Sequence, residues 1–274
     1  MLSQLAPWEP LWPLIALFAL ALAAYLAGIA RRRRARDIPS ALAFLLGLGL
    51  MYAAMQTRFD YYAQFMFFMH RIQHLALHHL GPFLIALSAP SAVLAAGTPR
   101  PLRTAGRRLA ASPPVRIGYR FLQQPVIAGL LFVGLIGFWL IPSVHFDAML
   151  DARLYWIMNL SMAVDGLLFW WFMLDPRPPG TTPVTRGVGL RILVLWALMP
   201  PQIALGAWIA LSPETLFDVY AVCGRAWPIS PLLDQQLGGL ITWIPAAMMS
   251  LLATLALLAF AFRHERERNR ESTP

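Results

Sequence analysis

Seven apolar runs divide this chain, and each is long enough to cross the hydrocarbon core of a membrane. A helix needs about 20 apolar residues to cover that core, which is ~30 Å thick. Only 13% of the 274 residues are charged and 58% are hydrophobic, whereas ordinary soluble domains carry about 25% charged residues. The sequence therefore predicts an all-α polytopic membrane helix bundle, forming one integral membrane domain over 1–274. The predicted spans lie near 11–30, 39–56, 62–96, 125–142, 152–174, 188–211 and 236–262.

The first and third runs differ from simple membrane spans. The first run lacks a basic segment before it and continues for about 20 residues, so it is typical of a signal anchor or first span rather than a cleaved signal peptide. The third run is long for one span. Gly81-Pro82 and Ala89-Pro90 interrupt it, and proline removes a helical hydrogen bond, so we expect a kink or a helix–loop–helix there.

The arginines predict the orientation of the bundle. Arginine blocks follow the first, third, fifth and seventh runs, and the alternate loops hold few arginines. Arginine-rich loops stay on the cytoplasmic side, so we expect the N-terminus outside and the C-terminus inside. The net charge of +9 is thus explained by cytoplasmic loops beside a lipid bilayer, and we predict no nucleic-acid partner. The blocks are Arg31–Arg34 with Arg36, Arg100–Arg120, Arg177–Arg191 and Arg263–Arg270.

Four histidines within ten residues lie inside the third run. Ionisable side chains in a bilayer cost several kcal/mol unless they face a cavity, a partner or a metal. His70, His74 and His78 recur every four residues and share one helical face, with Met66 one turn before His70. Imidazole and thioether together suit copper, Cu(I) above all. His79 points about 100° away from His78 on an α-helix, so we expect it to be structural.

The alternative is a structural role without a metal, in which these histidines are neutral and hydrogen-bond across helices. The predicted orientation opens the candidate site to the outer side. Asp234 starts the last run at that side, where it could ligate a cation, hold an imidazole or cap its helix. Asp165 belongs to a polar stripe with Asn159, which we expect to pack against the histidine face. Gln73 is expected to orient a ligand imidazole.

The sequence lacks the motifs of several common enzymatic and cofactor-binding sites. The single cysteine, Cys223, forms no intrachain disulfide. The chain carries no Walker-type loop, no G-x-S-x-G, no C-x-x-C and no C-x-x-C-H haem attachment sequence. No nucleophile is paired with a base. We therefore predict that the protein is not an enzyme.

Three segments together resemble a known family. These are His70-Arg71-Ile72-Gln73-His74 with the Gly81-Pro82 and Ala89-Pro90 pairs, Phe169-Trp170-Trp171, and Asp234-Gln235-Gln236-Leu237-Gly238-Gly239. They are similar to the H-x-x-Q-H, F-W-W and D-Q-Q-x-G-G segments of the CtaG cytochrome c oxidase assembly proteins, and the resemblance covers about residues 40 to 262.

The resemblance implies a seven-span protein of the bacterial inner membrane that helps to assemble a heme-copper oxidase through copper delivery. It implies His70 and His74 as key positions and Asp234 as a supporting one, an oxidase subunit as partner, and a periplasmic copper chaperone as a further partner. Many members carry more histidines in the span that matches 152–174. Here Met158 and Met162 stand in that span, so a metal site would use His70, His74, His78, Met66 and Asp234, with help from these methionines.

Three rival functions stay open. A scaffold that binds no metal would use the histidines as interhelical contacts. A copper transporter would need further ligands towards the cytoplasm and repeat symmetry. A haem-bearing membrane oxidoreductase would need axial histidines on two helices, but His70 and His74 lie on one. The absence of a Soret band would exclude haem, and copper uptake into proteoliposomes would identify a transporter.

Overall fold

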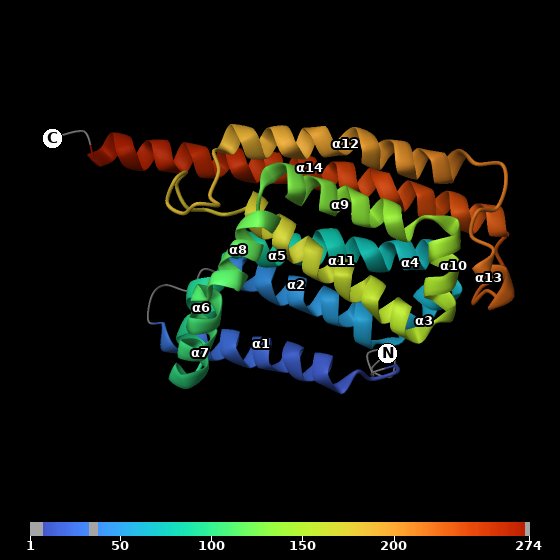
Figure 1. The fold of residues 1–274 in the computed structure, drawn as a ribbon, viewed down its shortest axis with the longest axis horizontal. Helices are drawn as coiled ribbons and strands as arrows, with labels where there is room; N and C mark the ends of the chain where they lie inside the picture. Colours follow the sequence, from blue (N-terminus) through green and yellow to red (C-terminus); the bar gives the residue numbers. More distant parts are fainter. Residues whose placement is uncertain (1–7, 33–37, 272–274) are drawn as a thin grey trace.

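The computed structural model describes residues 8–32 and 38–271, and it is built from helices (Figure 1). Five helices are long and apolar enough to cross a membrane. The count rises to seven if each of two bent helix pairs forms one span. The prediction of an all-α membrane bundle is confirmed. The five are α1 (Trp12–Arg31), α2 (Ile38–Gln56), α11 (Ala152–Met173), α12 (Val188–Leu211) and α14 (Pro231–Glu271), of which Pro231–Arg263 is the apolar part.

The first bent pair contains the histidines. Helix α4 (Phe67–His74), a π-helical turn η2 (Leu75–Leu80) and α5 (Gly81–Leu87) form one continuous rod. That rod bends by 77° into α6 (Ser91–Gly97). The predicted break at Ala89-Pro90 is therefore confirmed, and Ala89 has a positive φ of 46° there. The expected kink or break at Gly81-Pro82 is not a break, because the helix continues through it with a wider turn just before the proline.

The second bent pair lies at the same end of the bundle. Helix α8 (Pro113–Leu122) meets α9 (Pro125–Trp139) at 73°. Between α6 and α8 lies α7 (Arg100–Ala111), which has no buried residue. Figure 1 shows α6, α7 and α8 gathered across one end of the molecule, beside the end of α1. There α6 packs closely against α1. A Cβ added to Gly97 would lie only 1.7 Å from the Ala24 carbonyl oxygen.

The opposite end carries three short helices, α3 (Arg58–Phe65), α10 (Pro142–Leu150) and α13 (Val219–Val222) (Figure 1). Two predicted boundaries need correction here. The third run does not begin as one helix at residue 62, because Met66 is extended and separates α3 from α4. The fourth does not reach residue 142, because α9 ends at Trp139.

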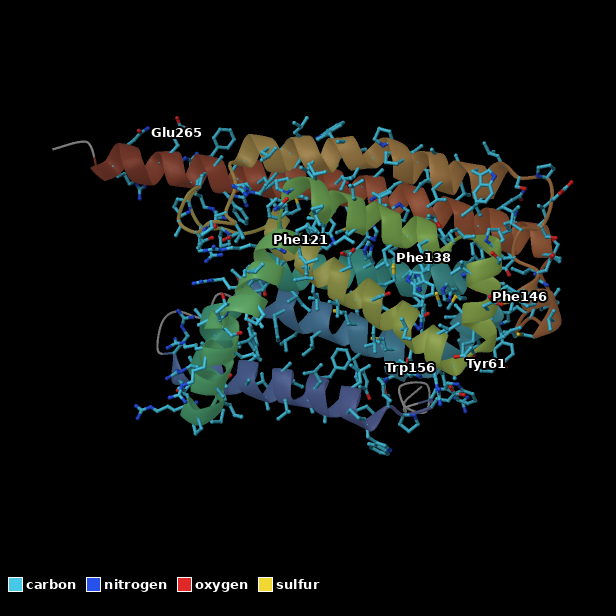
Figure 2. The ribbon with its side chains drawn as sticks, viewed as in Figure 1. Tyr61, Phe121, Phe138, Phe146, Trp156 and Glu265 are labelled. Atoms are coloured by element: carbon cyan, nitrogen blue, oxygen red, sulfur yellow. The ribbon has the colours of Figure 1, made fainter. Side chains whose placement is uncertain are left out.

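Polarity is arranged as a bilayer requires. Apolar side chains cover the outside of the bundle (Figure 2), and Phe121 and Phe138 are each about half exposed. The buried polar side chains inside include Asn159, Asp234 and five histidines: His70, His74, His78, His79 and His145. The arginine-rich helix α7 and the arginine-rich end of α14 lie at the same end of the molecule (Figure 1), as the orientation prediction requires. Residues 33–37, which hold part of the first arginine block, lie outside the described residues.

Candidate metal centre

Asp234 fixes the start of the histidine helix. Its two carboxylate oxygens accept hydrogen bonds from the backbone N–H groups of Phe67 at 3.1 Å and Phe68 at 2.9 Å. Arg225 Nε lies 3.4 Å from the same carboxylate. A carboxylate is stabilised by the free N–H groups at a helix N-terminus. Of the roles open to Asp234, the structure shows a cap, although it caps α4 and not its own helix.

His70 and His74 lie side by side in the middle of the bundle. Their ring centroids are 4.3 Å apart, and both side chains are buried. Within the described part of the chain, neither ring nitrogen of His70 makes a well-aligned hydrogen bond, although the Ala63 backbone carbonyl lies near the ring, and His74 Nδ1 has no partner. The other nitrogen, His74 Nε2, lies 3.2 Å from Asn159 Oδ1. Because a neutral imidazole carries a proton on one nitrogen, His70 and His74 each offer one nitrogen that can accept or ligate.

A fifth buried histidine joins this pair from α10. The ring of His145 is 5.1 Å from that of His70. Its Nδ1 lies 3.1 Å from the Trp139 carbonyl oxygen and its Nε2 lies 3.0 Å from the Tyr220 hydroxyl. Burial lowers the pKa of His145 to about 3, and the positive charge of Arg71 adds to the shift. His145 is therefore neutral and already uses both nitrogens.

His78 and His79 form a second polar group with Asp165. His78 Nε2 is 2.9 Å from Asp165 Oδ2, and His78 Nδ1 is 3.3 Å from His79 Nδ1. Together with the bond between His74 and Asn159, this contact confirms that the polar stripe of α11 packs against the histidines. His78 has both nitrogens in contact with neighbours, so it does not present a free ligand atom as His70 does.

The π-helical turn explains the placement of these two histidines. A proline at position 82 lacks the N–H that would bond the His78 carbonyl in an α-helix. Instead, Trp170 Nε1 donates to that carbonyl oxygen at 3.0 Å, and the Gly81 N–H bonds Ala76 O five residues back. Helix α11 approaches closely here, because a Cβ on Gly166 would lie 2.5 Å from His78 O.

A small, partly open cavity lies beside these residues. Its lining includes Arg71, His74, His79, Met162 and Thr242, and it has room for roughly one water-sized sphere, about 10 Å³. Arg71 is buried, and its Nε and Nη1 have no partner among the described residues. His79 Nε2 also lacks one. His79 lines this cavity together with His74, although residues five apart lie on different faces of an α-helix. The expectation that His79 is structural stays a prediction.

Gln73 has a different role from the one expected. Its Nε2 donates to Asp60 Oδ1 at 2.7 Å and to the Ala54 carbonyl at 2.8 Å. Tyr155 donates to the same Asp60 oxygen at 2.7 Å. Gln73 therefore joins α4 to α2, α3 and α11, and the prediction that it orients an imidazole is wrong.

The predicted ligands do not converge into one closed site. Met66 is buried and is the extended N-cap of α4, and its carbonyl accepts a hydrogen bond from the His70 N–H at 3.0 Å. Among the residues that the structure describes, no three His, Cys, Asp or Glu side chains come close enough to hold one metal ion. What the structure brings together is the pair His70 and His74, with Asp234 as the cap of their helix.

Comparison with known protein families shows which family this chain belongs to. A family model described as cytochrome c oxidase caa3 assembly factor (Caa3_CtaG) matches residues 23–264. The chain belongs to that family. The predicted resemblance to the CtaG proteins is thus confirmed, and the match includes α4, α11 and the apolar part of α14.

Curated relatives of this Caa3_CtaG chain occur in mycobacteria. It is 26% identical over 253 residues to an uncharacterised protein of Mycobacterium leprae (strain TN), which covers 86% of this chain and 36% of the relative. It is 27% identical over 269 residues to uncharacterised proteins of Mycobacterium bovis and Mycobacterium tuberculosis, covering 90% of this chain and 38% of each relative. The chain therefore spans little more than a third of the length of these relatives. No solved structure matches it.

Two residues of this family member escaped sequence reasoning. The sequence places His145 near the outer end of the fourth span, 75 residues after His70, and no local pattern joins the two. Arg71 lies between histidines inside an apolar run. A charged side chain at such a position indicates a functional role. An arginine in a span is costly unless it faces a partner or a cavity, and here it faces the cavity.

Proposed function

We propose that this Caa3_CtaG protein assembles a heme-copper oxidase by holding Cu(I) and handing it over, without catalysing a reaction. The observation that carries the proposal is the pair of adjacent, buried rings of His70 and His74, each of which has a nitrogen without a hydrogen-bond partner among the described residues. Unpaired polar atoms inside an apolar bundle are unfavourable, and binding copper would satisfy them. The copper is cargo and leaves the protein.

Weak retention suits such a carrier. Arg71 places a positive charge beside His74 without a carboxylate partner among the described side chains. Like charges repel more strongly in a low-dielectric interior, so Arg71 lowers the affinity for a cation. Two imidazoles without a closed ligand shell leave a position for exchange. Both features favour release to a partner over permanent storage.

The proposed setting follows from the arginine pattern. We place the protein in the bacterial inner membrane with the N-terminus outside and the C-terminus inside. His70 then lies near the periplasmic side, because α4 begins at the end opposite the arginine-rich helices. A periplasmic copper chaperone would load the site. The acceptor would be an oxidase subunit that contacts the apolar outside of the bundle.

The test replaces His70→Ala and His74→Ala together. We expect copper in the purified protein to fall to background and oxidase activity in the membranes to fall with it, while the amount of protein stays unchanged. His264→Ala, in the basic C-terminal part of α14, is the matched control and should retain copper. Copper is measured by mass spectrometry of metals, and oxidase activity by oxygen consumption.

A scaffold that binds no metal is the second candidate, and the absence of a closed group of three ligands among the described residues favours it. In that case the wild-type protein carries no copper after anaerobic loading with Cu(I). A double variant with full copper content and normal oxidase activity refutes the assignment of His70 and His74 as ligands.

A further inference from the structure

The contacts around His79 leave its Nε2 without a partner and are compatible with a ligand role for that nitrogen. An ionised carboxylate only accepts hydrogen bonds, so with Asp165 ionised, His78 Nε2–H donates to Asp165 Oδ2 at 2.9 Å. The neutral His78 ring then has a lone pair on Nδ1. His79 Nδ1–H donates to that lone pair across 3.3 Å. His79 Nε2 has no partner among the described residues, and in this arrangement it carries a lone pair that can bind a metal ion.

The same reasoning applies to His74. The carboxamide oxygen of Asn159 accepts, so His74 Nε2–H donates to it at 3.2 Å. His74 Nδ1 is then unprotonated, and it too lacks a partner within the described chain. α11 thus contacts His74 directly through Asn159 and His79 indirectly through His78 and Asp165, and this arrangement leaves one ligand nitrogen on each ring. Partners of this kind commonly fix the tautomer of metal-binding histidines.

The π-turn brings the two rings to one cavity. In an α-helix, residues five apart lie on different faces. In a π-helix, hydrogen bonds join residues i and i+5, so such residues lie one turn apart. His74 and His79 are five apart, the second lies inside η2, and both line the cavity together with Met162. His78, at the α-helical spacing from His74, bonds Asp165 instead.

We infer that this cavity is a second position for Cu(I), bound by His74 Nδ1, His79 Nε2 and the thioether of Met162. The inference rests on the proposed function, because the same copper would occupy it. His74 contributes to both positions: it pairs with His70 in one and with His79 in the other. Exchange of one histidine for the other moves the ion along α4 and η2 without full dissociation.

The ligand set and the charge both select Cu(I). Two imidazoles and a thioether suit Cu(I), whereas Zn²⁺ sites usually include thiolates, carboxylates or more histidines. Arg71 lines the same cavity. The repulsion between its charge and a bound ion scales with the charge of the ion, so a divalent ion is disfavoured about twice as strongly.

The experiment measures Cu(I) affinity of the purified protein by anaerobic competition with a chromophoric Cu(I) chelator. We expect His79→Ala to weaken binding by at least about tenfold, because loss of a group that only orients a metal ligand already costs about 10–100-fold in affinity. Met162→Leu should remove sulfur scattering from the X-ray absorption spectrum of the bound copper. Met173→Leu is the matched control, since Met173 is also fully buried on α11 but packs in a separate apolar cluster. It should leave affinity and spectrum unchanged.

The outcomes separate the two proposals. If His79→Ala and Met162→Leu bind Cu(I) as the wild type does, while His70→Ala with His74→Ala abolishes binding, the second position is wrong and the proposed function stands. If the wild type itself binds no Cu(I), both fail. Size-exclusion profiles and helical content of each variant identify any that fail to fold. For a misfolded His79→Ala, His79→Gln keeps the side-chain volume and is used instead.

Discussion

Asp60 is an acid that the fold buries at the start of the histidine segment, just outside the spanning rods. It is 1% exposed and accepts hydrogen bonds from Gln64, Gln73 and Tyr155. Burial raises the pKa of Asp60 to about 6, although these hydrogen bonds oppose the change. A raised pKa means that folding favours the protonated form. The stabilisation from Asp60 is therefore complete below its ordinary pKa of 3.8 and is lost as the pH rises through about 6.

We predict that Asp60→Asn flattens this pH dependence. A shift of about two units corresponds to roughly 3 kcal/mol of unfolding free energy between pH 4 and pH 7. The wild type should lose thermal stability over that interval, and the variant should lose much less. Unfolding temperatures in detergent between pH 4 and pH 8 measure this, with the exposed Asp147→Asn as control. Parallel curves for wild type and Asp60→Asn would contradict the prediction.

At the level of elements, α11 and the π-turn support each other through close backbone contact. A Cβ on Gly166 would lie 2.5 Å from His78 O, 2.8 Å from His78 Cα and 2.9 Å from His78 C. These are backbone atoms, which cannot rotate away as a side chain can. Trp170 on the same helix supplies the hydrogen bond that Pro82 cannot. The position of α11 therefore fixes the shape of the π-turn.

Gly166→Ala should consequently separate α11 from the turn. We expect a loss of roughly 1–3 kcal/mol, typical of overpacking, and a weakened contact between His78 and Asp165. Gly134→Ala in α9 is the control, because nothing lies within 4 Å of its added methyl group. Thermal unfolding compares the two variants. Equal stability of Gly166→Ala and the wild type would show that the helices can shift without cost.

The elements also show how far sequence reasoning reaches. The bounds of α2, α11 and α12 were predicted to within one residue, because bilayer thickness fixes the length of an apolar helix. The contact between α11 and the histidines followed from Asp165 and Asn159, since buried polar groups need partners. The π-turn could not be predicted from the sequence, because one additional residue in a helical turn leaves the apolar pattern unchanged. The role of Gln73 and the approach of His145 depended on tertiary packing that no local pattern encodes.

For the whole molecule, the orientation in the membrane remains a prediction with a direct test. The arginine-rich helices and the loop with Asp218 lie at opposite ends of the bundle (Figure 1). We replace Cys223→Ser and introduce either Arg107→Cys in α7 or Asp218→Cys. Both positions are exposed. With the N-terminus outside, a membrane-impermeant maleimide should label Asp218→Cys in intact spheroplasts and Arg107→Cys only after lysis. The reverse labelling pattern would invert the orientation.

The π-turn also restricts insertions and deletions in this segment during evolution. It holds one residue more than an α-helical turn, so removal of a single codon between His74 and Pro82 would restore regular winding. Every side chain beyond the deletion would then rotate by about 100° relative to His74. Descendants of this chain can exchange many apolar residues in that stretch, but they cannot change its length and keep His79 facing the same cavity. Among homologues, we therefore expect the eight-residue step from His74 to Pro82 to persist together with His79, and to vary where His79 is lost.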